Sequence, residues 1–229
     1  MKYNDLVNMY KDFKEKYKDN AYKYVSKLLQ NAKEIHKKDW EKLPTPNKDH
    51  EQSWRAFKGK NLEKLIIHII KDEVESLGLK IIEGNTLERK NSANLSEELN
   101  RVKRNLLIHY GEFGSHLPDV DIIIYNPDNC KIIAVISSKV TLRERIAQTG
   151  YWKIKLLADK VTKHIKVFFV TPDEDGTLTI RYPAKKGRAI VEVDTDGSYV
   201  MSEIKVEESE NVKMFEHFIV DLANLLRKK

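Results

Sequence analysis

The chain has 229 residues, 41% of them hydrophobic and 33% charged, which suits one domain with an appendage or two small domains. Its single cysteine, Cys130, excludes an intramolecular disulfide and a cysteine-based zinc cluster, and no apolar stretch is long enough to cross a bilayer. The 41 Lys and Arg residues against 35 Asp and Glu leave a net charge of +6, which is compatible with a polyanionic partner but does not identify one. We expect a cytoplasmic protein with no membrane association.

The first half of the chain is predicted to be mainly helical. Apolar spacing and polar breaks predict, in order, helical segments over 3–42 with a break at 19–20, a loop over 43–53, a helix over 53–77, a strand over 79–83, a loop over 85–95 and a helix over 96–109. Ser53 and Ser96 are the expected N-terminal caps of the last two helices, and Gly78 is the expected stop of the longer one.

The second half alternates apolar runs with helical segments. The expected elements are strands over 121–125 and 132–137 joined by a turn, a helix over 141–158, a strand over 165–171, short strands and turns over 174–206, and a helix over 208–228. The first two strands lack a polar face, so both faces of this antiparallel hairpin are predicted to be buried. The helix between two strands implies a crossover, and therefore a parallel pair.

These elements predict an α/β protein, with a mixed central β-sheet flanked by helices and a helical N-terminal part. We assign residues 1–45 to the helical N-terminal region and residues 53–229 to the main domain. This architecture alone does not specify a function.

A candidate site lies where the predicted hairpin ends. Asp121 opens the first strand and Lys139 follows the second, so antiparallel pairing makes them neighbours at one sheet edge. Asp119 is expected on the same side as Asp121, because side chains in a strand alternate. Carboxylates can hold a hard divalent cation here, and the lysine can orient water or stabilise developing charge. The alternative is an Asp–Lys pair that merely closes a hairpin, or two unrelated surface residues.

Glu63 is the candidate for a further carboxylate at this edge. It lies beside an apolar stripe on the predicted helix over 53–77, from which it could reach the sheet as a second metal ligand. The alternative is a solvated glutamate that pairs with Lys60 or Lys64.

The segment after Lys139 carries an unusual charge pattern. Arg143 and Arg145 stand near the predicted start of a helix, where the helix dipole disfavours positive charge. A DNA phosphate would compensate for this, so we interpret Arg143, Arg145, Gln148 and Lys153 as one side of a DNA-binding groove. The alternative is a solvated charged face in which Glu144 partners the arginines.

Taken together, these segments resemble a known family. The stretch PDVDIIIYNPDNCKIIAVISSKVTLRERI resembles the active-site hairpin of PD-(D/E)xK type II restriction endonucleases, and most closely that of the BsaWI-like subgroup. In that subgroup a strand opened by Asp is followed by a strand ending in Ser-Lys and then by Arg-acid-Arg. An upstream Trp, Gly and helical glutamate are matched by Trp54, Gly59 and Glu63 in SWRAFKGKNLEKLI. The resemblance covers residues 53–171.

The resemblance implies specific roles. Asp121 would be the metal-binding aspartate, with Asp119 as a weaker claimant, and Lys139 would be the catalytic lysine. The acidic residue usual two positions before the lysine is Ser137 here, and a hydroxyl is a poor metal ligand. A carboxylate from elsewhere would have to substitute for it, either Glu63 or Glu144.

The implied activity is Mg²⁺-dependent hydrolysis of double-stranded DNA at a short, palindromic site by a homodimer, with a cognate methyltransferase in the same system. A backbone carbonyl near Ser138 would complete the metal site, and residues 1–45 would serve dimerisation or DNA contact. The alternatives are a junction resolvase or repair nuclease on the same fold, and a catalytically decayed DNA-binding protein, for which Ser137 is the best evidence. A further alternative, compatible with the composition, is a protein scaffold that uses no cofactor. The recognised bases are not readable from the sequence.

Overall fold

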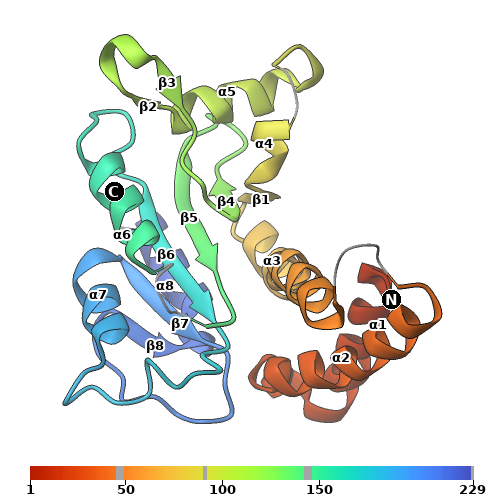
Figure 1. Ribbon diagram of the computed structural model, residues 1–229. Helices are drawn as coiled ribbons and strands as arrows, with labels where there is room; N and C mark the ends of the chain where they lie inside the picture. The colour runs from red at the N-terminus through yellow and green to blue at the C-terminus, as the bar shows by residue number, and fades with distance from the viewer. Residues whose placement is uncertain (45–48, 90–91, 142–145, 228–229) are drawn as a thin grey trace.

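The computed structural model describes residues 1–44, 49–89, 92–141 and 146–227. Its centre is a six-stranded mixed sheet with strand order β1-β4-β5-β6-β7-β8 (Figure 1). β4 is antiparallel to both β1 and β5, whereas β5, β6, β7 and β8 run parallel. The strands of this sheet are β1 Lys80–Glu83, β4 Ile122–Tyr125, β5 Ile132–Ser138, β6 Lys166–Thr171, β7 Gly197–Val200 and β8 Val212–Met214. A separate hairpin pairs β2 Ile108–His109 with β3 Ser115–His116.

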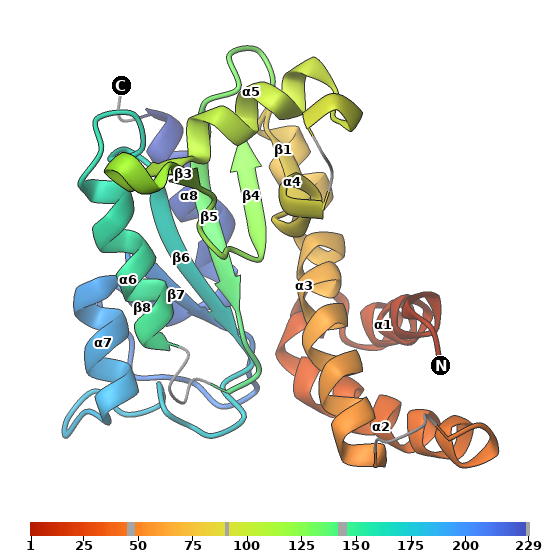
Figure 2. The same ribbon diagram turned by 45° about the horizontal axis from the view of Figure 1, so that its top comes forward.

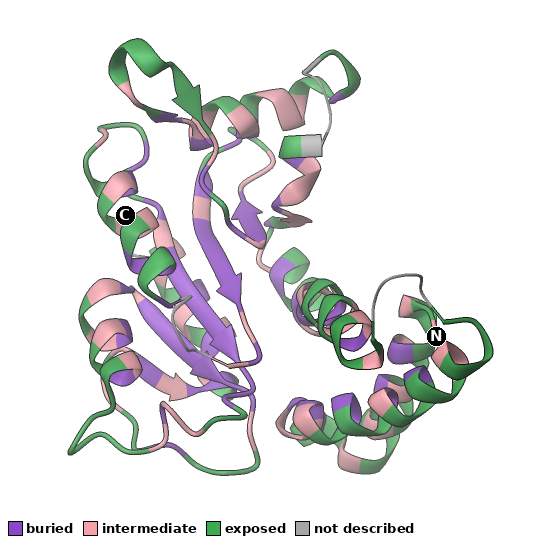
Figure 3. Cartoon of the chain, viewed as in Figure 1, coloured by how far each residue is buried: buried purple, intermediate pink, exposed green. Residues whose placement is uncertain are grey.

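Helices cover both faces of the sheet. α3 and α8 share one buried cluster with Ile122, Ile136 and Phe168, and the opposite face packs against α5, α6 and α7. The helices around the sheet are α3 His50–Ser76, α4 Asn85–Arg89, α5 Glu97–Leu106, α6 Ile146–Leu157, α7 Lys186–Asp194 and α8 Phe218–Arg227. The central strands are therefore buried on both faces, whereas the helices expose one side (Figure 3). This confirms the predicted α/β class.

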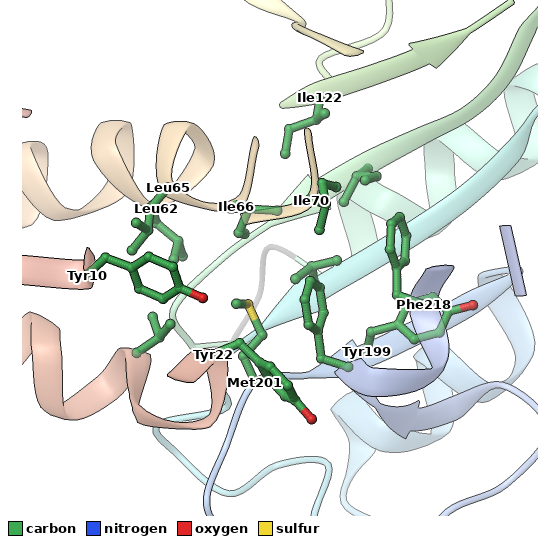
Figure 4. Packing of buried hydrophobic residues seen from close by; sticks show 14 of the residues in the cluster. Tyr10, Tyr22, Leu62, Leu65, Ile66, Ile70, Ile122, Tyr199, Met201 and Phe218 are labelled. Atoms are coloured by element: carbon green, nitrogen blue, oxygen red, sulfur yellow. The ribbon is translucent and has the colours of Figure 1, made fainter. Parts of the chain in front are cut away.

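The helical N-terminal part packs on α3 (Figure 2), and its Tyr22 also contacts Phe215, the residue after β8, with ring centroids 5.3 Å apart. It consists of α1 Tyr3–Tyr17, a 3-10 helix Lys18–Tyr24 and α2 Val25–Lys42. The apolar stripe of α3, which includes Leu65 and Ile66, lies between Tyr10 of α1 and Ile122 of β4 (Figure 4). One continuous buried cluster thus links this N-terminal part to the sheet through α3 and through Phe215.

The predicted antiparallel hairpin is confirmed, with Ile122 opposite Ile136, and so is the parallel pairing of β5 with β6. Ser96 caps α5 as predicted. The proposed cap at Ser53 is wrong: α3 begins at His50, because the carboxylate of Asp49 accepts a hydrogen bond from the Gln52 amide at 2.7 Å.

Three further expectations are corrected. The segment 85–95 is not only loop, because α4 and a short 3-10 helix bury Leu87 against the main domain. The segment 174–206 contains α7, whose buried Arg188 donates to the carbonyl oxygens of Leu178 and Glu207. The segment 208–228 is not one helix, since the residues before α8 include β8, which extends the sheet. Among the described residues, no helix has the length and apolar character needed to cross a membrane.

Candidate active site

The ends of β4 and β5 bring Asp121 and Lys139 together. The Asp121 amide donates to the Ile136 carbonyl at 3.1 Å, which extends the hairpin pairing by one residue. Its Oδ2 accepts hydrogen bonds from the Ser138 amide and from Lys139 Nζ, both at 2.6 Å. The side chains of Asp121 and Lys139 are only 11% and 22% exposed. This is the ion pair that the hairpin register predicts.

Gly84 fixes the backbone that carries Asp121. Gly84 directly follows β1, the strand that pairs with β4, and its amide donates a hydrogen bond to the Asp121 carbonyl at 2.8 Å. A Cβ at residue 84 would lie 1.8 Å from the Val120 carbonyl oxygen. Any side chain there would push the segment before β4 outward, so glycine is required by this close approach.

Glu63 reaches the same place from α3. Burial raises its pKa to about 8, the nearby charge of Asp121 adds to this effect, and Lys139 opposes it. The Glu63 and Asp121 carboxyl groups are close enough to share a proton. Two acids thus converge on one lysine, and the raised pKa means that Glu63 keeps its proton near neutral pH unless a further positive charge joins the cluster.

The two serines before the lysine are both buried at the end of β5. Ser138 supplies its amide to Asp121, and within the described part of the chain its buried hydroxyl meets no hydrogen-bond partner. Ser137 stands in the sheet opposite Phe169 of β6. It offers no carboxylate, so Glu63 is the described acid that joins Asp121.

A cleft of about 1270 Å³ opens beside this cluster. Glu63, Ser138 and Lys139 line it, together with residues of α3, the segment after β6 and the start of α7. Among its lining residues, the additional cations are Arg55, Lys58, Lys185 and Lys186. Glu174 and Asp175 line it as well, so the cleft holds more cations than acids rather than cations alone, and this balance suits a polyanion.

Sequence reasoning missed these four cations. On α3 a signal was available, because Arg55, Gly59 and Glu63 follow at intervals of four residues and so share one helix face. The segment 174–187 gave no such signal, because only the tertiary fold brings it to the cleft.

The remaining predicted site residues lie elsewhere. Asp119 is exposed and accepts a hydrogen bond from Gln148 Nε2 at 2.8 Å. The expected alternation between Asp119 and Asp121 does not apply, because β4 begins only at Ile122. Lys153 forms a partly buried ion pair with Asp196, so we do not include it in a DNA-binding surface. The predictions for Arg143, Glu144 and Arg145 fall outside the described residues.

The chemistry of the cluster fits a hard divalent cation. A cation between Glu63 and Asp121 would favour the ionised form of Glu63 against the burial and the Asp121 charge that raise its pKa, and carboxylate oxygens are the ligands that Mg²⁺ prefers. In the described ranges no group of three or more His, Cys, Asp or Glu side chains is placed to hold a metal. Two carboxylates would leave the other ligand positions to water and substrate, as is usual for Mg²⁺.

Comparison with solved structures defines the class of the fold. The restriction endonuclease AgeI, solved in complex with DNA, superimposes with a TM-score of 0.56 at 14% identity, over 97% of this chain and 91% of that one. At this identity the likeness shows a shared fold, which is that of a restriction endonuclease.

Comparison of sequences gives the family. Residues 98–221 match the family described as BsaWI restriction endonuclease type 2. MjaVIP of Methanocaldococcus jannaschii, which bears the name of a type II restriction enzyme, is 38% identical over 219 residues, covering 90% of this chain and 94% of that protein. HpyAORF263P of Helicobacter pylori, named in the same way, is 42% identical over 130 residues, covering 57% and 65%. The chain therefore belongs to the BsaWI family of type II restriction endonucleases, a class of site-specific deoxyribonucleases.

Proposed function

We propose that the protein hydrolyses phosphodiester bonds of double-stranded DNA at a short specific site, and that it requires Mg²⁺ to do so. The observation that carries this proposal is the convergence of Glu63, Asp121 and Lys139 at the edge of a basic cleft. A structural ion pair would need one acid for its lysine, whereas this cluster has two.

In the proposed mechanism, Asp121 and Glu63 would hold the cation, together with a backbone carbonyl near Ser138. Bound Mg²⁺ would supply positive charge that polarises the phosphate and neutralises the charge that develops on it. Lys139 donates hydrogen bonds that orient the attacking water and stabilise the same charge. Water forms a new bond to phosphorus as the bond to the 3′ oxygen breaks, and the proton lost by water is balanced by one gained at that oxygen. The products are 5′-phosphate and 3′-hydroxyl ends.

The assembly we propose is a homodimer, because a two-fold symmetric site is matched by a two-fold symmetric protein. Residues 1–45 would serve dimerisation or DNA contact. Since the host genome would carry the same short site, we also expect a cognate methyltransferase, and we place both proteins in the cytoplasm. Light scattering coupled to gel filtration would test the dimer, with and without duplex DNA.

The experiment that tests the activity is incubation of the purified protein with plasmid and phage DNA, in Mg²⁺ and in EDTA, over a range of temperatures. Discrete fragments that form only with Mg²⁺ are expected, and mapping their ends gives the site. A smear would support a nuclease without sequence preference. Salt-sensitive DNA binding without cleavage would support a catalytically decayed DNA-binding protein. Ser137, which stands in place of the usual acid, would then explain the loss of activity.

A further inference from the structure

An ion pair joins the two walls of the cleft. Lys58, on α3, donates from Nζ to Oε2 of Glu174, in the segment after β6, at 3.2 Å. The two residues are 116 positions apart in the sequence, and both line the cleft that contains Glu63 and Lys139. Their side chains are 21% and 25% exposed, so water reaches the pair and a ligand in the cleft could reach it too.

The structure holds Glu174 more firmly than Lys58. The Glu174 amide donates to the carbonyl of Val140, the residue after Lys139, at 3.2 Å. The preceding Asp173 accepts hydrogen bonds from the amides of Thr177 and Leu178, both at 2.9 Å, which closes the segment into a fixed turn. The carboxylate is thus presented from an ordered turn, whereas Lys58 meets it at the end of a long flexible stem.

A DNA phosphate would compete directly for this lysine. A phosphodiester carries one negative charge, as a carboxylate does, and lysine binds either as a point charge. The other basic residues of the cleft include Arg55 on the same helix, one turn before Lys58, so a DNA strand passing through the cleft would meet both. Glu174 would then have to give up the lysine, because one ammonium cannot hold both anions at the same position.

We infer that Lys58 is a contact to the backbone phosphate of double-stranded DNA, and that Glu174 occupies the place of this phosphate in the DNA-free enzyme. DNA must displace Glu174 in order to bind. Displacing Glu174 lowers the affinity for duplexes of every sequence. Only duplexes that make enough further contacts with the protein then bind stably. Because the penalty is the same for every sequence, Glu174 lowers the occupancy of duplexes that make few other contacts and leaves the ratio of affinities between sites unchanged. This inference rests on the proposed function, since it requires DNA in the cleft.

The exchange makes a distinctive prediction for salt dependence. In Glu174→Gln no carboxylate has to be displaced, so affinity for a duplex of arbitrary sequence should rise about three- to tenfold at low salt. When the wild type binds DNA, the Glu174 carboxylate loses Lys58 and attracts a cation from solution in its place, which offsets part of the counterion release from the DNA. The slope of log affinity against log salt should therefore be steeper in Glu174→Gln, by up to about one.

A double-mutant cycle tests the exchange. Fluorescence anisotropy with a labelled duplex, in EDTA to prevent cleavage and over a range of NaCl concentrations, gives affinities for wild type, Glu174→Gln, Lys58→Met and the double variant. Lys58→Met should weaken binding, and in its background Glu174→Gln should change affinity by less than about twofold. Glu75→Gln is the matched control, because it removes the same charge from the Lys71–Glu75 pair on α3, outside the cleft.

The outcomes separate this inference from the proposed function. If the wild type binds no duplex at all, the proposed function and this inference both fall. If the wild type binds but Glu174→Gln behaves like Glu75→Gln, only the exchange is overturned. The same holds if Glu174→Gln tightens binding equally with and without Lys58, because general repulsion then explains the effect. Thermal unfolding of each variant shows that the fold is retained.

Discussion

Two clusters in this molecule are built from the same kinds of residue at the sheet. In the first, Asp121 accepts hydrogen bonds from the Ser138 amide and from Lys139, both at 2.6 Å. In the second, Asp196 precedes β7 and accepts a hydrogen bond from the Val167 amide at 2.9 Å. It also pairs with Lys153 of α6. Each is a mostly buried aspartate held by one backbone amide and one lysine.

The two clusters differ in the third charged group that lies beside the aspartate and its lysine. At Asp196 it is Lys166, at 3.0 Å. Burial alone would raise the pKa of Asp196, but the hydrogen bonds from Lys153, Val167 and Lys166 outweigh this and lower it. At Asp121 the third group is Glu63, and burial together with the charge of Asp121 raises the pKa of Glu63 to about 8. The cluster with excess lysine needs no further cation, whereas the cluster with excess acid is the one to which the proposed function assigns a cation.

The largest effect is expected from Lys139→Ala. Loss of the ammonium removes the donor that would act on the phosphate, so cleavage should fall at least about 100- to 1,000-fold. Binding of duplex DNA in EDTA should remain. Plasmid cleavage with Mg²⁺ measures the first effect, and anisotropy the second.

Lys153→Ala is the control for Lys139→Ala, because it removes the corresponding lysine of the other cluster. It should lower stability and spare cleavage at temperatures where it stays folded. Cleavage by Lys139→Ala at the wild-type rate would show that the assignment of the active site is wrong.

Asp196→Asn should lower the free energy of unfolding by about 1–3 kcal/mol, because it leaves the partly buried Lys153 without its ion partner. Since the folded-state pKa of Asp196 is lowered, its contribution is complete above the unfolded pKa, near pH 4, and is lost as the pH falls through the folded value. Urea unfolding of wild type and variant should therefore differ most near neutral pH and converge in acid. A constant difference at all pH values would contradict the linkage to this carboxylate.

Glu63→Gln should change the free energy of unfolding in the opposite direction to Asp196→Asn. The folded-state pKa of Glu63, about 8, lies above its usual value, so ionisation opposes folding as the pH rises from about 4.5 to 8. Without metal, the glutamine variant should be more stable than wild type by about 1–2 kcal/mol at pH 8, with little difference near pH 4. It should also lose cleavage. If Glu63→Gln were less stable than the wild type in EDTA, the positive charge of Lys139 would have to be sufficient to stabilise both ionised carboxylates in the folded protein.

The sequence predicts the first cluster far better than the second. Asp121 and Lys139 flank two unbroken apolar strands, so pairing rules alone bring them together. Lys153 could be placed on a helix, but its partner Asp196 lies 43 positions further on, beyond a crossover. A lysine whose acid cannot be located looks free, so the sequence alone favours its interpretation as a DNA contact.

Long-range packing also explains the missed elements. α7 has nine residues and buries only Arg188 and Val191, so no apolar stripe marks it. Its anchor is the contact of Arg188 with two distant backbone carbonyls, which no local pattern reveals. The same applies to Glu174, because its position opposite Lys58 depends on the whole sheet between them.

The smallest effect is expected from Asp119→Asn, which tests the remaining choice between two aspartates. Asp119 is exposed and its recorded hydrogen bond is to Gln148, so the substitution should change stability by less than about 0.5 kcal/mol and leave cleavage nearly unchanged. Asp121→Asn should instead behave like Lys139→Ala. Plasmid cleavage over a series of Mg²⁺ concentrations compares the two. If Asp119→Asn raised the Mg²⁺ requirement as much as Asp121→Asn, the exposed aspartate would have to turn inward when metal and DNA bind. The aspartate paired with Lys139 would then be structural, like Asp196, and the contrast between the two clusters would rest on Glu63 alone.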